Sequence, residues 1–115
     1  MSLFNPFAHS TVMFRKRTFI EAGGYNEGFK YAQDYDLWLQ MLAFGEAYNL
    51  EDELSIIRLT EQSTSNQNNK MQKLEGLTIR WNAFRRFGGN PTNTLYYFIK
   101  SLVGLILPSK SYFNQ

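Results

Sequence analysis

The stretch that decides the fold is Tyr31-Ala32-Gln33-Asp34-Tyr35-Asp36-Leu37-Trp38-Leu39. In a helix, residues three, four and seven apart share one face. An apolar stripe with these spacings lies within and just after it: Leu37, Trp38, Met41 and Leu42. Asp34 lies in line with this stripe, whereas Asp36 lies in line with Gln40 on a more polar face. The sequence therefore predicts a helix over residues 33–44, closed by Gly45.

Two further helices are expected, one on each side of this segment. Residues 15–22 read as a short helix, which Gly23 and Gly24 stop because glycine tolerates the left-handed conformation at helix ends. A longer helix is expected from about residue 70 to residue 87, before the glycine pair at 88–89. The side chains expected to form its packing face are Met71, Leu74, Thr78, Trp81, Phe84 and Phe87.

Short apolar segments complete the predicted fold. Residues 11–14 read as a strand, and residues 47–50 and 54–59 read as two extended pieces. The polar residues 61–69 are expected to form a flexible loop. Residues 94–107 are largely apolar but too few to span a bilayer, so they form either a buried helix or one on a membrane surface. The predicted fold class is α+β, a mostly helical fragment with two or three short strands.

The composition limits the classes of protein that the chain can belong to. It has 115 residues, 43% hydrophobic and 19% charged, which favours one modest folded domain. It has no cysteine, which excludes disulfides and cysteine-based zinc sites. Residues 54–115 carry eight Lys or Arg against two Asp or Glu, so this basic tail favours phosphate or an anionic membrane surface as a neighbour. No nucleic-acid-binding motif accompanies the charge, so nucleic acid is not an expected partner.

Asp34 is the candidate catalytic residue, because it begins a helix on the edge of an apolar face. The dipole and free N–H groups of a helix N-terminus favour an ionised carboxylate. An ionised carboxylate held in position can act as a general base. An aspartate at a helix start more often caps the helix by accepting a backbone N–H. The local pattern leaves both roles open.

The motifs that carry a family resemblance are His9-Ser10-Thr11-Val12-Met13-Phe14-Arg15-Lys16, Gly23-Gly24-Tyr25-Asn26-Glu27, Gln33-Asp34-Tyr35-Asp36-Leu37-Trp38-Leu39, Asn49-Leu50, Ile57-Arg58, and Ser63 with Ser65. In their order and spacing, residues 5–66 resemble the downstream, acceptor-side half of family 2 glycosyltransferases. The resemblance implies the C-terminal part of a GT-A fold. Residues 1–4 are then expected to be a leader, and residues 67–115 a helical C-terminal extension.

The resemblance also implies an activity and a set of site residues. Such enzymes move a sugar from a nucleotide donor to an acceptor hydroxyl with inversion at the anomeric carbon. The family's Glu-Asp pair falls on Gln33-Asp34, so Asp34 takes the role of catalytic base. The implied substrate-binding residues are His9, Gln33, Tyr35, Trp38 and Arg58. Three of them have a plainer alternative: His9 as a structural residue, Trp38 as core, and Arg58 as a surface charge.

Cofactor and partners follow from the same resemblance. Asp34-Tyr35-Asp36 has the form of the family's Asp-x-Asp metal motif, but its carboxylates diverge on a helix, so no metal is assigned to this chain. A divalent metal, Mg²⁺ or Mn²⁺, is expected in the full-length enzyme, in a missing N-terminal nucleotide-binding half. The expected partners are a nucleotide-sugar donor and a glycan or lipid-linked acceptor. The expected setting is the cytoplasm, at the inner face of the membrane, in surface polysaccharide synthesis.

The chain alone is expected to be inactive, and bare strand edges and aromatic side chains are expected to drive self-association into a homo-oligomer. A rival interpretation is a non-catalytic sugar- or protein-binding module that uses the aromatic residues, which make up 17% of the chain. A second rival is a peripheral membrane-surface adaptor built on the basic tail and residues 94–107.

Overall fold

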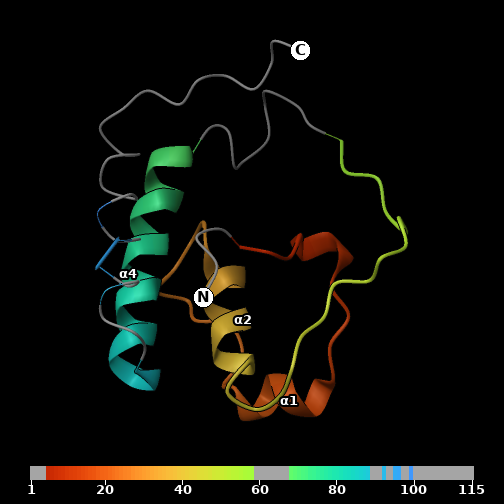
Figure 1. Cartoon of the computed structure of the whole chain (residues 1–115), viewed down its shortest axis with the longest axis horizontal. Helices are drawn as coiled ribbons and strands as arrows, with labels where there is room; N and C mark the ends of the chain where they lie inside the picture. The colour runs from red at the N-terminus through yellow and green to blue at the C-terminus, as the bar shows by residue number, and fades with distance from the viewer. Residues whose placement is uncertain (1–4, 59–67, 89–91, 93–94, 97–98, 100–115) are drawn as a thin grey trace.

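The computed structural model describes residues 5–58, 68–88, 92, 95–96 and 99. The helical elements are η1 (His9–Thr11), α1 (Lys16–Glu21), α2 (Gln33–Met41) and α4 (Asn69–Phe87). Figure 1 shows α2 beside α4, both running downward in that view, with α1 at the lower end of α2. Helix α2 contacts both other helices. It is therefore the central element of the described chain.

Helix α2 begins where the sequence predicts but ends at Met41, three residues before the predicted end at Phe44. The difference arises in the last turn. The N–H of Ala43 donates to the carbonyl of Gln40, and the N–H of Phe44 donates to that of Met41. These bonds span three residues rather than four, so the chain tightens into turns after Met41.

Helix α1 confirms the short helix predicted before the glycine pair. Gly23 and Gly24 have φ of 90° and 72°, in the left-handed region that favours glycine. The N–H of Gly24 donates to the carbonyl of Phe19, and the N–H of Gly23 donates to that of Ile20. This pair of bonds is the Schellman arrangement that ends helices and satisfies their last carbonyls.

Helix α4 confirms the predicted long helix and ends at Gly88, whose φ is 70°. The predicted packing face is wrong. The buried residues of α4 are Gly76, Leu77, Ile79 and Ala83. Trp81 and Met71, both on the predicted face, are 48% and 49% exposed. The buried face of α4 therefore includes small residues, Gly76 and Ala83, beside Leu77 and Ile79.

The core between α2 and α4 is small. Ala32, Tyr35 and Ile79 form one buried cluster, against which Phe29 and Leu39 pack. Ile79 is 1% exposed and contributes the largest fully buried side chain of α4. The start of α2 is therefore fixed against the middle of α4.

The predicted strands are wrong, and with them the α+β fold class: the residues described in Figure 1 contain helices and no strand. Residues 46–58 are exposed throughout, and Ile56 is fully exposed. A strand needs a neighbouring strand to accept its backbone hydrogen bonds. Within this segment the N–H of Leu54 donates to the carbonyl of Asp52, which is a local bond and not a strand pairing. Of residues 11–14, Thr11 is the last residue of η1, and its N–H and its hydroxyl both donate to the carbonyl of Ala8.

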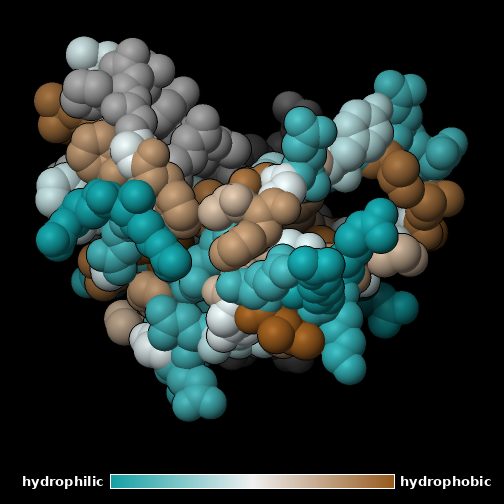
Figure 2. Space-filling model, turned by 90° about the horizontal axis from the view of Figure 1, so that it is seen from below, coloured by the Kyte–Doolittle hydropathy of each residue, from teal (hydrophilic) through white to brown (hydrophobic). Residues whose placement is uncertain are grey.

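Several predictions fall outside the described residues. These are the leader at residues 1–4, most of the loop at 61–69, and most of the segment at 94–107. Within the part of the chain that the structure describes, no helix is both long enough and apolar enough to cross a membrane. Figure 2 shows the face seen from below, where hydrophobic residues reach the surface in separate patches between hydrophilic ones.

Candidate active site

Asp34 lies in the first turn of α2 and is half-buried. Its Oδ1 accepts the backbone N–H of Tyr35 at 2.8 Å, and its Oδ2 accepts the side-chain amide of Asn5 at 2.8 Å. The carboxylate therefore accepts a backbone N–H within the first turn of its own helix, whose N-cap residue is Ala32. It also ties the N-terminal segment to α2 across 29 residues of sequence.

Asn5 is a site residue that the sequence did not reveal. Its Nδ2 donates to Asp34, while its Oδ1 accepts the N–H of Phe7 at 3.2 Å. The second bond fixes the amide in a local turn, because a short polar side chain can bond to the backbone two residues on. The chain before η1 thus presents a donor to the candidate base.

Glu75 of α4 holds the segment that leads into α2. Its Oε1 accepts the N–H of Lys30 at 3.0 Å, and its Oε2 accepts those of Tyr31 and Ala32 at 2.7 and 2.8 Å. The side-chain amide of Gln72 donates to the carbonyl of Tyr31 at 3.1 Å. One turn of α4 therefore fixes the backbone immediately before the residue pair Gln33-Asp34. No sequence motif pointed to Glu75.

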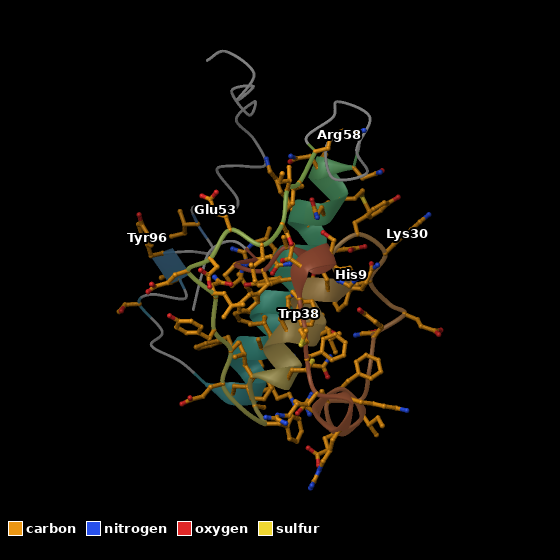
Figure 3. All side chains as sticks on the ribbon, turned by 90° about the vertical axis from the view of Figure 1, so that its right-hand side faces the viewer. His9, Lys30, Trp38, Glu53, Arg58 and Tyr96 are labelled. Carbon is orange, nitrogen blue, oxygen red and sulfur yellow. The ribbon has the colours of Figure 1, made fainter. Side chains whose placement is uncertain are left out.

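Trp38 lies at the centre of an aromatic cluster that joins η1, α1 and α2. The rings of His9, Phe14 and Phe7 lie 5.9, 5.8 and 6.4 Å from the Trp38 ring. The cluster closes through three further ring contacts: His9 with Tyr25, Tyr25 with Phe19, and Phe19 with Phe14. Figure 3 shows His9 and Trp38 close together near the middle of the molecule. The structure thus brings two predicted site residues together.

The burial of Trp38 matches its alternative role as a core residue, and Tyr35 is buried to a similar extent. Trp38 and Tyr35 are 5% and 6% exposed. Burial raises the pKa of Tyr35 above 10.0, and the opposing charge of Arg80, whose guanidinium lies 6.0 Å from the ring centre, lowers it. The Nε1 of Trp38 is buried and has no hydrogen-bond partner among the described residues.

The remaining predicted site residues are exposed. Gln33 lies on the surface beside Asp34 at the start of α2. His9 is exposed as well, although its ring packs against Trp38. Arg58 is exposed, and Figure 3 shows it well apart from His9 and Trp38. The structure therefore gathers Gln33 with Asp34, and His9 with Trp38, but leaves Arg58 at a distance.

Asp36 is more buried than Asp34, at 8% exposure. Its Oδ2 accepts the side-chain amide of Gln40 at 2.7 Å, the neighbour that the helical spacing predicted. Asp36 and Gln40 also line a surface cavity of about 190 Å³ between α2 and α4, which Asp34 does not line. The sequence did not indicate this cavity, because the α4 residues on its other side are more than 40 positions away.

The two aspartates of the Asp-x-Asp sequence have different hydrogen-bond partners. Asp34 bonds to Asn5 and to its own helix, whereas Asp36 bonds to Gln40. Across residues 5–58 and the described part of the later chain, no group of three or more metal-ligating side chains was found.

Similarity to known proteins indicates the class of enzyme to which this chain is related. The relatives that the chain matches are named glycosyltransferases, which supports the class that the motifs indicated. One is the amylovoran biosynthesis glycosyltransferase AmsE of Erwinia amylovora, 32% identical over 104 residues, which cover 89% of this chain and 39% of AmsE. Another is the O-antigen biosynthesis glycosyltransferase WbnJ of Escherichia coli, 34% identical over 104 residues, which cover 86% of this chain and 40% of WbnJ. The chain thus spans about two fifths of the length of these curated relatives. No family model and no solved structure matches it.

Proposed function

We propose that this chain is the acceptor-side part of an inverting family 2 glycosyltransferase that acts in polysaccharide synthesis. The observation that carries the proposal is the similarity, over 104 residues, to two enzymes named for polysaccharide or O-antigen biosynthesis. The ordered motifs around Gln33-Asp34 support the finer assignment to family 2 and to inversion. We assign binding of the nucleotide and of a divalent metal to a part of the protein outside these residues.

The proposed mechanism needs a base on the acceptor hydroxyl. The hydroxyl oxygen attacks the anomeric carbon of the donor, the bond from that carbon to the diphosphate breaks, and the nucleotide diphosphate leaves with the bonding pair. The carboxylate of Asp34 takes the hydroxyl proton. Inverting glycosidases use the same geometry with water in place of the acceptor.

The surroundings of Asp34 are compatible with this role. Each carboxylate oxygen accepts one hydrogen bond, from Tyr35 or from Asn5. An ionised carboxylate has about four lone-pair sites, so two remain for a substrate proton. The two bonds also fix the orientation of the group, which a general base requires. The hydrogen bond within the first turn of α2 is therefore compatible with catalysis by the same side chain.

The other predicted site residues are proposed in supporting roles. Gln33 is exposed at the start of α2, and His9 is exposed beside Trp38. Both are proposed to contact a sugar. Arg58 is proposed to contact donor phosphate, although it lies apart from the other site residues in this structure. Tyr35 and Trp38 act from the core by supporting the surface residues around them.

The decisive test is Asp34→Asn in the full-length enzyme. We expect turnover to fall about 10²–10⁴-fold, the usual contribution of a general base. Donor affinity, measured by calorimetry, should stay within about twofold, because Asp34 acts on the acceptor. Asp52→Asn is the matched control, since it removes an exposed carboxylate that lies outside the predicted site. An Asp34→Asn enzyme that keeps more than about a tenth of its turnover would remove Asp34 as the base.

Self-association is proposed on the basis of exposed apolar side chains. Met13 and Ile56 are 97% and 101% exposed, and Tyr48 is 75% exposed. Apolar side chains this exposed favour association with another surface. Sedimentation of the purified chain should show species larger than the 13.5 kDa monomer at high concentration. A single monomeric boundary at every concentration would contradict this.

A further inference from the structure

The cavity between α2 and α4 has a lining that mixes donors, acceptors and apolar atoms. Its polar side chains are three amides, one carboxylate and one guanidinium: Asn26, Gln40, Asn82, Asp36 and Arg86. Leu39 and Phe87 supply apolar atoms. The cavity is therefore neither a purely apolar groove nor a charged cleft.

The charges of the lining point to a neutral ligand. The single carboxylate of Asp36 and the single guanidinium of Arg86 leave no formal net charge. A phosphate would meet the carboxylate, and a metal ion would meet the guanidinium, so neither fits well. The three amides each offer both a carbonyl acceptor and an N–H₂ donor. A ligand with several hydroxyl groups, which donate and accept alike, matches this set.

Asp36 provides the most specific contact. It is 8% exposed, and its Oδ2 is occupied by the Gln40 amide. The described residues place no donor on its Oδ1. That oxygen is not among the buried side-chain atoms that lack a partner, so solvent reaches it, and a ligand donor would take the place of water there. A sugar hydroxyl entering the cavity beside Asp36 would supply such a donor.

The size and place of the cavity restrict the ligand further. Its volume of about 190 Å³ is below the roughly 300–1,000 Å³ typical of pockets for drug-sized ligands. It therefore suits one sugar ring rather than a whole nucleotide sugar. Asp36 follows Asp34 by two residues, a rotation of about 200° around the helix axis. The cavity thus opens away from the side of α2 on which the candidate base lies.

We propose that the cavity between α2 and α4 binds one neutral sugar unit. Given the function proposed above, on which this part rests, that unit belongs to the acceptor glycan and lies remote from the reacting hydroxyl. Asn82 and Arg86 of α4 and Asp36 of α2 hold it by hydrogen bonds. The site thereby favours acceptors that extend beyond the reacting residue.

The first test measures binding directly, on the full-length protein. Saturation-transfer NMR with the methyl glycosides of glucose, galactose, mannose and N-acetylglucosamine should show contact with at least one of them. Asn82→Ala and Arg86→Ala should each weaken that contact about tenfold, the effect of losing one good hydrogen bond. Arg85→Ala is the matched control, because it removes the same charge one position away and outside the cavity. All three side chains are exposed, so the variants are expected to fold.

The second test separates this site from the catalytic proposal. With an oligosaccharide acceptor, Arg86→Ala should raise the acceptor KM about tenfold and leave kcat within about twofold, because uniform binding is lost. With a monosaccharide acceptor the KM should not change. No contact with any methyl glycoside, or equal contact in wild type and both cavity variants, would overturn the sugar site. Sugar contact that both variants lose, in a protein without transferase activity, would uphold the site and overturn the function proposed above.

Discussion

The contact between Glu75 and the start of α2 gives the sharpest prediction about stability. Glu75→Ala removes a carboxylate that accepts three backbone N–H groups, from Lys30, Tyr31 and Ala32. These N–H groups come from the segment immediately before α2, where a helix has no carbonyl of its own to receive them. The carboxylate therefore acts as a cap supplied by another helix.

The expected loss follows from the exposure of each bond. A hydrogen bond to a charged group contributes about 1.5–3 kcal/mol net. The N–H of Lys30 is exposed, so water replaces Glu75 there. The bonds from Tyr31 and Ala32 are partly buried, and their two N–H groups would lose their partner. Taking the lower value for each of these two bonds gives a loss of about 3 kcal/mol. Small domains are stable by about 5–15 kcal/mol, so this loss is large.

Urea unfolding followed by circular dichroism measures the effect. With a slope of about 1–3 kcal/mol/M, a loss of 3 kcal/mol lowers the midpoint by about 1–3 M. Glu75→Gln keeps one oxygen for Tyr31 and Ala32 but turns an N–H₂ toward Lys30, so its loss should be about 1 kcal/mol. Glu53→Ala removes an exposed carboxylate and should change stability by less than about 0.5 kcal/mol. If Glu75→Ala lowers the free energy of unfolding no more than Glu53→Ala does, the capping role is refuted.

Three other predictions concern α2 and its neighbours. The raised pKa of Tyr35 means that the folded state favours the neutral phenol. Its contribution to the free energy of unfolding is therefore present below pH 10.0 and is lost as the pH rises through the pKa of the folded state. Thermal unfolding midpoints should therefore fall more steeply above that pH in the wild type than in Tyr35→Phe, and parallel curves would contradict this. Asn5→Ala removes the hydrogen bond that the side-chain amide of Asn5 donates to Asp34. Turnover of the full-length enzyme should therefore fall about tenfold while the donor KM stays constant. An unchanged turnover would limit Asn5 to a structural role. Ile79→Ala, at a site 1% exposed, should cost about 2–4 kcal/mol in urea unfolding, and a cost below about 1 kcal/mol would mean that the core relaxes around the gap.

The helices could be predicted because their signals are local. The start of α2 at Gln33 and the end of α1 before Gly23 depend on residues within one or two turns of each boundary. The glycine pair acts through its own backbone conformation, with φ of 90° and 72°. Such signals are present in the sequence whether or not the rest of the chain is folded.

The strands and the packing face of α4 could not be predicted in the same way. An apolar run such as residues 54–58 becomes a strand only if a partner lies beside it, and the described residues provide none. On α4 the sequence offers two faces, a large apolar one with Trp81 and a smaller one with Gly76 and Ile79. The close approach of α2 selects the smaller face, and that choice depends on tertiary contacts.

The candidate site was only partly readable for a related reason. Helical spacing placed Asp34 at the start of α2 and Asp36 next to Gln40, and both placements agree with the structure. Asn5 and Glu75 act on the same helix start from 29 and more than 40 residues away, through hydrogen bonds that leave no spacing pattern. Only the folded chain brings these groups together.

The position of α4 bears on how the site is built. The predicted C-terminal extension begins at residue 67, yet α4 shares a buried cluster with the start of α2 and supplies Glu75 to its backbone. The similarity to AmsE and WbnJ extends over 104 residues, more than residues 1–66 can hold, so it reaches into the region of α4 as well. Helix α4 holds the residues before Asp34 in place and also lines the cavity beside Asp36. It would therefore couple acceptor binding to the position of the base. An enzyme of this kind should lose turnover in Glu75→Ala under conditions in which the variant is still folded.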